Sequence, residues 1–389
     1  MSMFETGIIP VNAFKVKMGK PITKGRKKAA VEHIELDGRK MYPTDRFWKS
    51  MQMRFRFRKT IFKYFTPDEV FSRITEVDNG MVRYCVENSG DTPKLLAMTN
   101  PAKPIIQYDN LEDILRKPES NLVPGSVNYT NGVIQTAHNT SVPWKINIAG
   151  DDFVTRFHVD TPIDGFGKPA IYVSLLREVC VNGMVGYAPA FRTELNLGKK
   201  DEGVTFTLER ALENYSNEEM YNALIQRIES STTSFCSVYE AMKFHKTLVK
   251  IYNEGNTNYK KLVISREAGT SERDIGVFNK FYETVGDLNS MYGVANIDSI
   301  SPKKQKLFPT KARLYSLLNL ATEIATHDCK PAGARKMQGF VGQLLSDEFD
   351  MEGTADDPNI SWQDLFMKNR ETQEALQSSN ASVMDFDFN

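Results

Sequence analysis

A change of residue periodicity near Ser216 constrains the fold of this chain more than any other feature of its sequence. Before this point, turn signals separate short runs of β-branched and aromatic residues, as at 80–86, 105–108, 132–134 and 170–173. Such runs are typical of strands and hairpins. After this point, apolar residues recur at helical spacing over 216–228, 235–252 and 312–325. Ser216 and Glu219 also form a capping-box pattern, which predicts the start of a helix.

These patterns predict an α+β fold, with an antiparallel-rich sheet in the N-terminal half packed against helices of the C-terminal half. Short helices are expected at 67–74 and 111–115 within the first half. We expect three regions: a basic flexible arm over 1–40, a single α+β core domain over 41–345, and a partly disordered acidic tail over 346–389. Within the tail we expect a short helix over 361–376.

Charge is distributed unevenly along the chain, although the 389 residues carry equal numbers of basic and acidic side chains. Residues 1–63 contain sixteen basic and five acidic side chains, whereas residues 341–389 contain two basic and eleven acidic ones. Such polarity favours a polyanionic partner at the basic end. The alternative is that both ends are simply solvated.

The segment 42–65 interleaves basic and aromatic side chains around an Arg-Phe-Arg-Phe-Arg core. On a strand, Arg54, Arg56 and Arg58 would share one face about 7 Å apart, a spacing that suits a phosphate backbone, while nearby aromatic rings could stack bases. The candidate nucleic-acid-binding residues are Arg46, Trp48, Lys49, Arg54, Arg56, Arg58, Lys59 and Lys63. The alternative is a half-buried strand whose phenylalanines belong to the core and whose arginines are simply exposed to solvent.

The sequence contains no GxSxG elbow, HExxH motif or P-loop, so we expect a protein without catalytic residues, cofactor or metal. The cysteines lie far apart, at Cys85, Cys180, Cys236 and Cys329, and are expected to be reduced. No run approaches the ~20 apolar residues of a membrane span. We therefore expect a cytoplasmic protein, and the sequence leaves its oligomeric state open.

Two polar motifs stand out in the second half of the strand region and in a later helix. The first contains Arg177, Cys180, Asn182 and Gly183, and the second contains Asn319, Thr322, Glu323 and His327. In the second motif a helix would align Asn319, Glu323 and His327 on one stripe. Because no second Glu/His pair accompanies it, we interpret the stripe as a packing network and not as a metal site. We expect the polar residues of both motifs to be buried and to join the two halves.

In this order the two motifs resemble a phage/plasmid-like protein family of unknown function found on phages and mobile elements, over roughly residues 65–330. The resemblance implies a phage or plasmid gene expressed in a bacterial cytoplasm, and it carries over no active site. The ending also resembles the acidic tails of single-stranded-DNA-binding proteins, through Asp385, Phe386, Asp387 and Phe388. In those proteins such tails dock partners and compete with DNA for the basic groove.

We therefore expect a non-catalytic phage protein that binds nucleic acid, with single-stranded DNA as the favoured partner, and that acts in phage DNA replication or recombination. Its tail is expected to contact phage or host replication proteins. Two alternatives remain open: a structural, host-takeover or anti-defence interaction protein, and an enzyme of unrecognised type. A filter-binding or gel-shift assay with single-stranded and duplex DNA tests the nucleic-acid-binding prediction against both alternatives.

Overall fold

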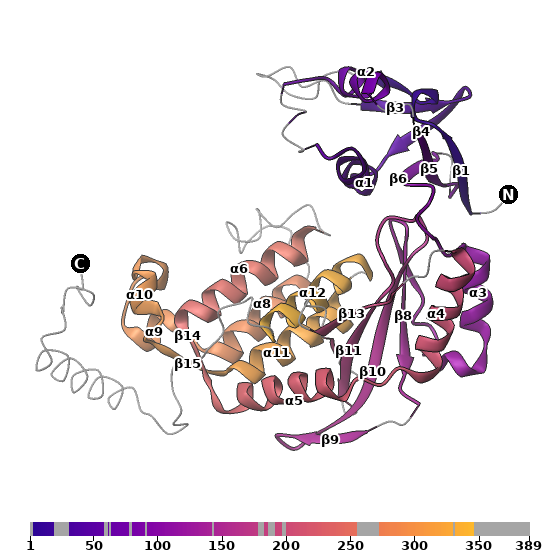
Figure 1. Ribbon diagram of the computed structural model, residues 1–389. Helices are drawn as coiled ribbons and strands as arrows, with labels where there is room; N and C mark the ends of the chain where they lie inside the picture. Colours follow the sequence, from indigo (N-terminus) through magenta and orange to yellow (C-terminus); the bar gives the residue numbers. More distant parts are fainter. Residues whose placement is uncertain are drawn as a thin grey trace, which may run out of the picture. The chain divides into compact units, whose positions relative to one another are not determined.

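The computed structural model describes residues 3–18, 31–57, 61, 64–77, 80–89, 92–141, 144–177, 183–185, 191–196, 200–254, 272–329 and 331–345. It confirms the α+β class, with antiparallel-rich sheets in the N-terminal half and helices in the C-terminal half (Figure 1). The chain divides into two compact units where a single core domain was predicted. Unit 1 comprises Met1–Pro143, Arg156–Tyr172 and Thr193–Ser216, and unit 2 comprises Trp144–Thr155, Val173–Arg192 and Asn217–Asn389.

Unit 1 begins with a six-stranded sheet of strand order β1-β5-β6-β4-β3-β2. Its strands are β1 (Phe4–Pro10), β2 (Lys15–Met18), β3 (Val31–Leu36), β4 (Arg39–Pro43), β5 (Met81–Glu87) and β6 (Lys94–Thr99). Neighbouring strands are antiparallel, except that β4 and β6 are parallel. The prediction of a flexible arm is therefore wrong for the described residues before 40. Gly19, Pro21 and Gly25, which interrupt any regular pattern in this stretch of the sequence, lie outside the described residues.

Helices α1 (Asp45–Phe55) and α2 (Pro67–Val77) pack on one face of this sheet. Phe47 and Met51 of α1, with Val70 and Phe71 of α2, are buried among strand residues such as Ile34. The 3-10 turn Val11–Ala13 adds its Val11 side chain to the same core. This packing fixes α1 and α2 beside each other, which matters for the site described below.

A second sheet has the strand order β12-β11-β10-β8-β7, with β9 paired to β10 and β13 to β11. These strands are β7 (Asn128–Thr130), β8 (Val133–Asn139), β9 (Lys145–Ile148), β10 (Asp151–Pro162), β11 (Ala170–Arg177), β12 (Gly183–Val185) and β13 (Arg192–Glu194). In unit 1, helices α3 (Tyr108–Arg116) and α4 (Asp201–Asn214) lie side by side against β8 and β10 (Figure 1). Their apolar faces, including Leu111 and Leu208, meet Phe157 in one core.

Unit 2 is mainly helical. Its helices are α5 (Glu218–Thr233), α6 (Val238–Glu254), α8 (Glu272–Val285), α9 (Leu288–Tyr292), α10 (Pro302–Gln305), α11 (Leu314–Glu323) and α12 (Pro331–Leu344), and its short strands β14 (Phe235–Ser237) and β15 (Pro309–Arg313) pair. Phe244 is central to the core, with ring centroids 6.2 Å from Phe281 and 5.5 Å from Phe340. A π-helical turn, Ile324–Asp328, continues α11.

Most local predictions are confirmed, and their errors are instructive. The helices predicted at 67–74 and 111–115 are present as α2 and α3. Helix α5 begins one residue later than predicted, because the Asn217 side chain, and not Ser216, accepts the N–H of Met220. The strand predicted at 105–108 is wrong, and α4 was not predicted. The helix predicted over 361–376 lies outside the described residues. Among the described helices, none has the length and apolar character needed to cross a bilayer.

A candidate nucleic-acid interface

The basic and aromatic segment after Tyr42 forms a helix where a strand was predicted. Thr44 caps its start by accepting the N–H of Phe47, and the helix continues through Phe55. Apolar side chains at helical spacing, Phe47 and Met51, are fully buried. This eleven-residue pattern outweighs the shorter Arg-Phe alternation, so Arg54 and Arg56 do not lie along a strand face.

Arg56 ends the helix in the left-handed conformation, with φ 55° and ψ 37°. Its backbone N–H and that of Phe57 both donate to the carbonyl of Gln52, so the chain turns sharply after the helix. The left-handed backbone conformation costs energy for residues other than glycine. The turn leaves the Arg56 side chain exposed.

An apolar groove of about 510 Å³ lies between this turn and α2, and we call it the α1–α2 groove. Its walls are mainly hydrophobic. The lining residues are Arg54, Phe55, Arg56, Phe57, Ile61, Phe65, Glu69, Val70, Arg73 and Ile74. Three of them are arginines, and the one carboxylate, Glu69, accepts the backbone N–H of Thr66 at 2.7 Å. Helix α2 starts with this capping box, and the Thr66 hydroxyl in turn accepts the N–H of Glu69.

Two consecutive aromatic residues with exposed rings, Tyr64 and Phe65, precede α2, and Phe65 lines the groove. Tyr64 is 81% exposed, and Phe65, a lining residue, is 47% exposed. By contrast, Trp48, which the sequence analysis placed among the binding residues, is half-buried, with its ring in edge contact with Phe47 at 5.1 Å and Phe71 at 6.5 Å. The structure therefore offers Tyr64 and Phe65 as stacking surfaces, and it uses Trp48 to pack α1 against α2.

The other predicted binding residues differ in their exposure and in whether the structure describes them. Lys49 is exposed on α1, and Arg54 is half-buried, with its guanidinium carbon 5.4 Å from the Phe55 ring centroid. Arg58, Lys59 and Lys63 lie outside the described residues. Arg73, which the sequence analysis missed, belongs to the groove. The signal for it was present, because the Thr66–Glu69 capping box predicts a helix that brings Arg73 and Ile74 onto one wall.

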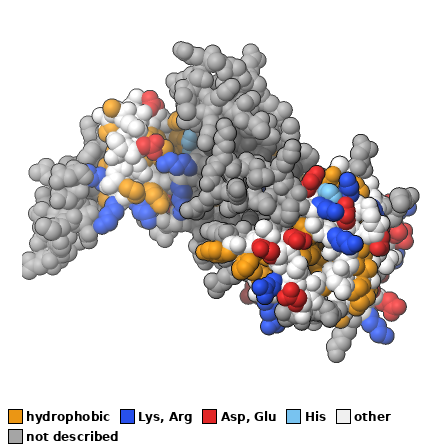
Figure 2. Space-filling model, turned by 90° about the horizontal axis from the view of Figure 1, so that it is seen from above, with side chains coloured by type: hydrophobic (Ala, Val, Ile, Leu, Met, Phe, Trp, Pro, Cys, Tyr) orange, Lys and Arg blue, Asp and Glu red, His pale blue; other side chains and the backbone are white. Residues whose placement is uncertain are grey.

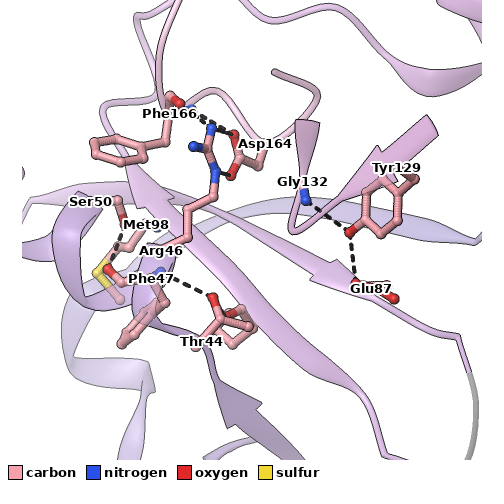
Figure 3. A network of polar contacts seen from close by, with 11 residues as sticks. Thr44, Arg46, Phe47, Ser50, Glu87, Met98, Tyr129, Gly132, Asp164 and Phe166 are labelled. Atoms are coloured by element: carbon pink, nitrogen blue, oxygen red, sulfur yellow. Dashed lines mark hydrogen bonds and ion pairs between the residues drawn. The ribbon is translucent and has the colours of Figure 1, made fainter. Parts of the chain in front are cut away.

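Arg46 is committed to a buried ion pair with Asp164 (Figure 3). The Arg46 Nε lies 2.5 Å from Asp164 Oδ2, and Nη2 lies 2.9 Å from Oδ1. Nη2 also donates to the carbonyl of Phe166, and the guanidinium lies 5.0 Å from the centroid of the Phe166 ring. The side chain of Asp164 has no exposed surface. Arg46 is therefore unsuited to the phosphate contact that the sequence analysis predicted for it.

The loop that carries Asp164 depends on glycine. Gly165 and Gly167 have φ of 74° and 124°, and a Cβ on Gly165 would come within 2.8 Å of Ile105. Gly132, with φ 83°, lies against Asp164, and a Cβ there would come within 2.8 Å of Oδ2. Burial raises the pKa of Asp164, while Arg46 and the N–H of Phe166 act in the opposite direction. The loop is thus shaped to hold one carboxylate against one guanidinium.

A second polar network supports the same region of unit 1. The Tyr129 hydroxyl donates to Glu87 Oε2 at 2.7 Å and accepts the N–H of Gly132 at 2.9 Å (Figure 3). Lys94 pairs with the other oxygen of Glu87 at 3.1 Å. Burial raises the pKa of Tyr129, and the hydrogen bond to Glu87 raises it further. These contacts tie β5 to the turn between β7 and β8.

The described residues on the face shown in Figure 2 are mixed in charge. Figure 2 shows Lys and Arg side chains interspersed with Asp and Glu and with hydrophobic patches. Several cations of the basic region have partners: Arg39 contacts Glu5 at 2.6 Å, and Lys17 lies 3.8 Å from Glu35. The α1–α2 groove is distinguished by combining arginines with exposed rings, and not by net charge.

In unit 2 the first sequence motif is linked through Asp151 to α11, the helix that carries Asn319, Thr322 and Glu323 of the second motif. Arg177 Nη2 contacts Asp151 Oδ1 at 2.6 Å, and the Tyr315 hydroxyl donates to Oδ2 at 2.7 Å. Burial and this hydrogen bond raise the pKa of Tyr315 to about 12. Asn319, one turn further along α11, is half-buried. Arg177 is therefore linked to α11 by polar contacts through Asp151, which was not predicted, and the contact residue on α11 is Tyr315.

Other motif residues fit the prediction less well. Glu323 pairs with Lys280, with its side chain 39% exposed, and His327 is exposed, contrary to the prediction of burial. Thr322 is buried, and its hydroxyl donates to the Asn319 carbonyl at 2.9 Å. Gly183 opens β12, whereas Cys180 and Asn182 lie outside the described residues.

Two cysteines of the described part of the chain, Cys85 and Cys236, are buried. Burial raises the pKa of the thiols of Cys85 and Cys236, which disfavours the reactive thiolate. No group of three or more His, Cys, Asp or Glu side chains there is arranged to hold a metal ion. The tail residues Asp385, Phe386, Asp387 and Phe388 lie outside the described residues.

Comparison of the chain with protein-family models, curated proteins and solved structures gives no match. The resemblance to the phage/plasmid-like family therefore stays a prediction.

Proposed function

We propose that this chain is a non-catalytic, phage-encoded protein that binds single-stranded nucleic acid, with DNA as the favoured partner, in the cytoplasm of a bacterial host during phage DNA replication or recombination. The observation that carries the proposal is the α1–α2 groove. It combines aromatic walls with arginines, and it lies in the segment whose composition first suggested nucleic acid. Aromatic surfaces next to cations are the usual platform for single strands.

The groove favours unpaired bases over duplex. The phenylalanine and aliphatic part of its lining suits the face of a base, because a phosphate placed against those side chains would lose hydration without compensation. A base inserted between Phe57 and Phe65 would bury its faces, while Arg54, Arg56 and Arg73 would meet the flanking phosphates. Because duplex bases are already stacked, insertion from a duplex would cost unstacking energy. The groove also offers few groups for reading base edges, so we expect little sequence preference.

Fluorescence anisotropy with labelled single-stranded and duplex DNA at several salt concentrations tests this proposal. The wild type should prefer the single strand. Each lost phosphate contact should lower the slope of log affinity against log salt by about 0.7. Arg56→Gln and Arg73→Gln should each lower it, and Phe65→Ala should weaken binding by about 1–3 kcal/mol without changing the slope.

Arg116→Gln is the matched control, because Arg116 is an exposed arginine of α3, elsewhere in unit 1, whose guanidinium pairs with Glu112. It should leave affinity and slope unchanged. If the wild type binds neither DNA nor RNA, or if the groove variants behave like the control, the proposal is rejected.

A further inference from the structure

The ion pair between Arg46 and Asp164 and the α1–α2 groove lie at opposite ends of one helix. Arg46 is the second residue of α1, and Arg54 and Phe55, which line the groove, are its last two. At 1.5 Å per residue, the helix connects the two sites over roughly 12 Å. A force on its first turn therefore moves the groove wall unless other contacts hold the helix.

Those other contacts are apolar side chains and hydrogen bonds to β6, including the one from the Thr44 hydroxyl, just before α1, to the Leu95 carbonyl at 3.2 Å. The buried side chains Phe47 and Met51 give α1 its apolar attachment, and Ser50 accepts the N–H of Met98 from β6 at 2.9 Å. The apolar contacts tolerate small rotations of a helix, and each of these hydrogen bonds fixes only one point on it. The paired hydrogen bonds from Arg46 to Asp164 are directional, and the fully buried carboxylate has a fixed place in its glycine-shaped loop.

We infer that Asp164 is a positioning residue for the α1–α2 groove, acting through Arg46 and making no contact with nucleic acid itself. This inference rests on the proposed function for its binding consequence, but its structural part does not. An isolated buried ion pair rarely adds stability over apolar packing. A positioning role, which depends on the direction of the hydrogen bonds, explains better than a stabilising role why the pair is held by a loop with two glycines at positive φ.

The two roles open to Arg46 make opposite predictions. A phosphate contact would give Arg46→Gln a smaller salt slope and would leave Asp164→Asn without effect. A positioning pair would make both variants weaken binding with an unchanged slope. The double variant would then bind no worse than either single variant, because the second change removes nothing further.

The experiment uses the full chain and two measurements. Hydrogen–deuterium exchange of the native protein reports whether α1 loosens, and anisotropy with labelled oligothymidylate reports binding. For Asp164→Asn we expect faster exchange along α1 through the turn at Arg56, and about tenfold weaker binding, equivalent to 1.4 kcal/mol. Arg46→Lys, which keeps the charge but not the paired hydrogen bonds, is the milder variant if Asp164→Asn does not fold.

Lys94→Gln is the matched control for Arg46→Gln. Both variants remove the cation that pairs with a buried carboxylate of unit 1, but the pair of Lys94 with Glu87 does not involve α1. It should leave exchange of α1 and binding unchanged. If α1 exchanges at the same rate in Asp164→Asn as in the wild type, the inference is overturned. It is also overturned if the slope of log affinity against log salt falls in the Arg46 variants alone. If the wild type binds no oligothymidylate, the proposed function fails, and exchange alone decides whether Asp164 positions α1.

Discussion

Protonation of His138 should destabilise unit 1 in a defined pH range. This side chain has no exposed surface. Its Nδ1 lies 2.7 Å from the Ser120 carbonyl and Nε2 lies 2.6 Å from the Thr136 hydroxyl. Because a carbonyl only accepts, Nδ1 carries the proton and Nε2 accepts from Thr136 in the neutral ring. The ring also stacks on Phe157 at 5.1 Å.

Burial lowers the pKa of His138 from 6.5 to about 4. Between these values the unfolded chain binds a proton that the native chain does not, so stability falls as the pH is lowered through this window. One pKa unit corresponds to 1.36 kcal/mol, so the loss between pH 7.5 and 4.5 is about 2–3 kcal/mol.

Urea unfolding of the wild type and of His138→Gln at pH 7.5 and 4.5 measures this loss. The variant should be less stable at pH 7.5, but its stability should change with pH by about 2–3 kcal/mol less than that of the wild type. Acidic groups titrate in both proteins and cancel in the comparison. Equal pH dependence in the two proteins would refute the assignment of a buried neutral ring.

Three further predictions follow from other contacts. Thr44→Ala removes the N-cap of α1 and should lower the free energy of unfolding by about 1 kcal/mol, whereas an unchanged urea midpoint would mean that another group caps the helix. Tyr315→Phe removes the hydrogen bond to Asp151 and should cost about 1.5–3 kcal/mol in the same assay; a neutral result would place water at that carboxylate. Deleting residues 380–389 should tighten binding of single-stranded DNA at low salt, where the Debye length exceeds the ~8 Å of physiological salt, and unaltered affinity at every salt concentration would leave the tail without an inhibitory role.

Predictions from local patterns succeeded best. Helices α5, α6 and α11 of unit 2 were predicted to within a few residues, because apolar side chains recur at helical spacing within each of them. The segment after Tyr42 was misassigned because two periodicities overlap there. The short Arg-Phe alternation was given more weight than Thr44, Phe47 and Met51, which define a helix.

Contacts between distant residues were not predictable. Strand β1 looked like part of a flexible arm because its partner is β5, with Phe4 opposite Glu87. Arg46 and Asp164 are 118 positions apart, and nothing in either local sequence indicates the other. The groove was half predictable, since Arg54, Arg56 and its phenylalanines lie in the segment identified from composition, but its second wall, which includes Arg73, comes from α2.

The most direct test of the account is the place where single-stranded DNA contacts the protein. A single strand carrying iododeoxyuridine can be cross-linked by ultraviolet light to nearby aromatic side chains, and the modified peptides can be identified by mass spectrometry. We predict cross-links at Phe57, Tyr64 or Phe65, and their loss on competition with unlabelled single strand but not with duplex. Cross-links confined to unit 2, or no specific cross-link to the full chain, would contradict the proposal that the α1–α2 groove binds single-stranded nucleic acid.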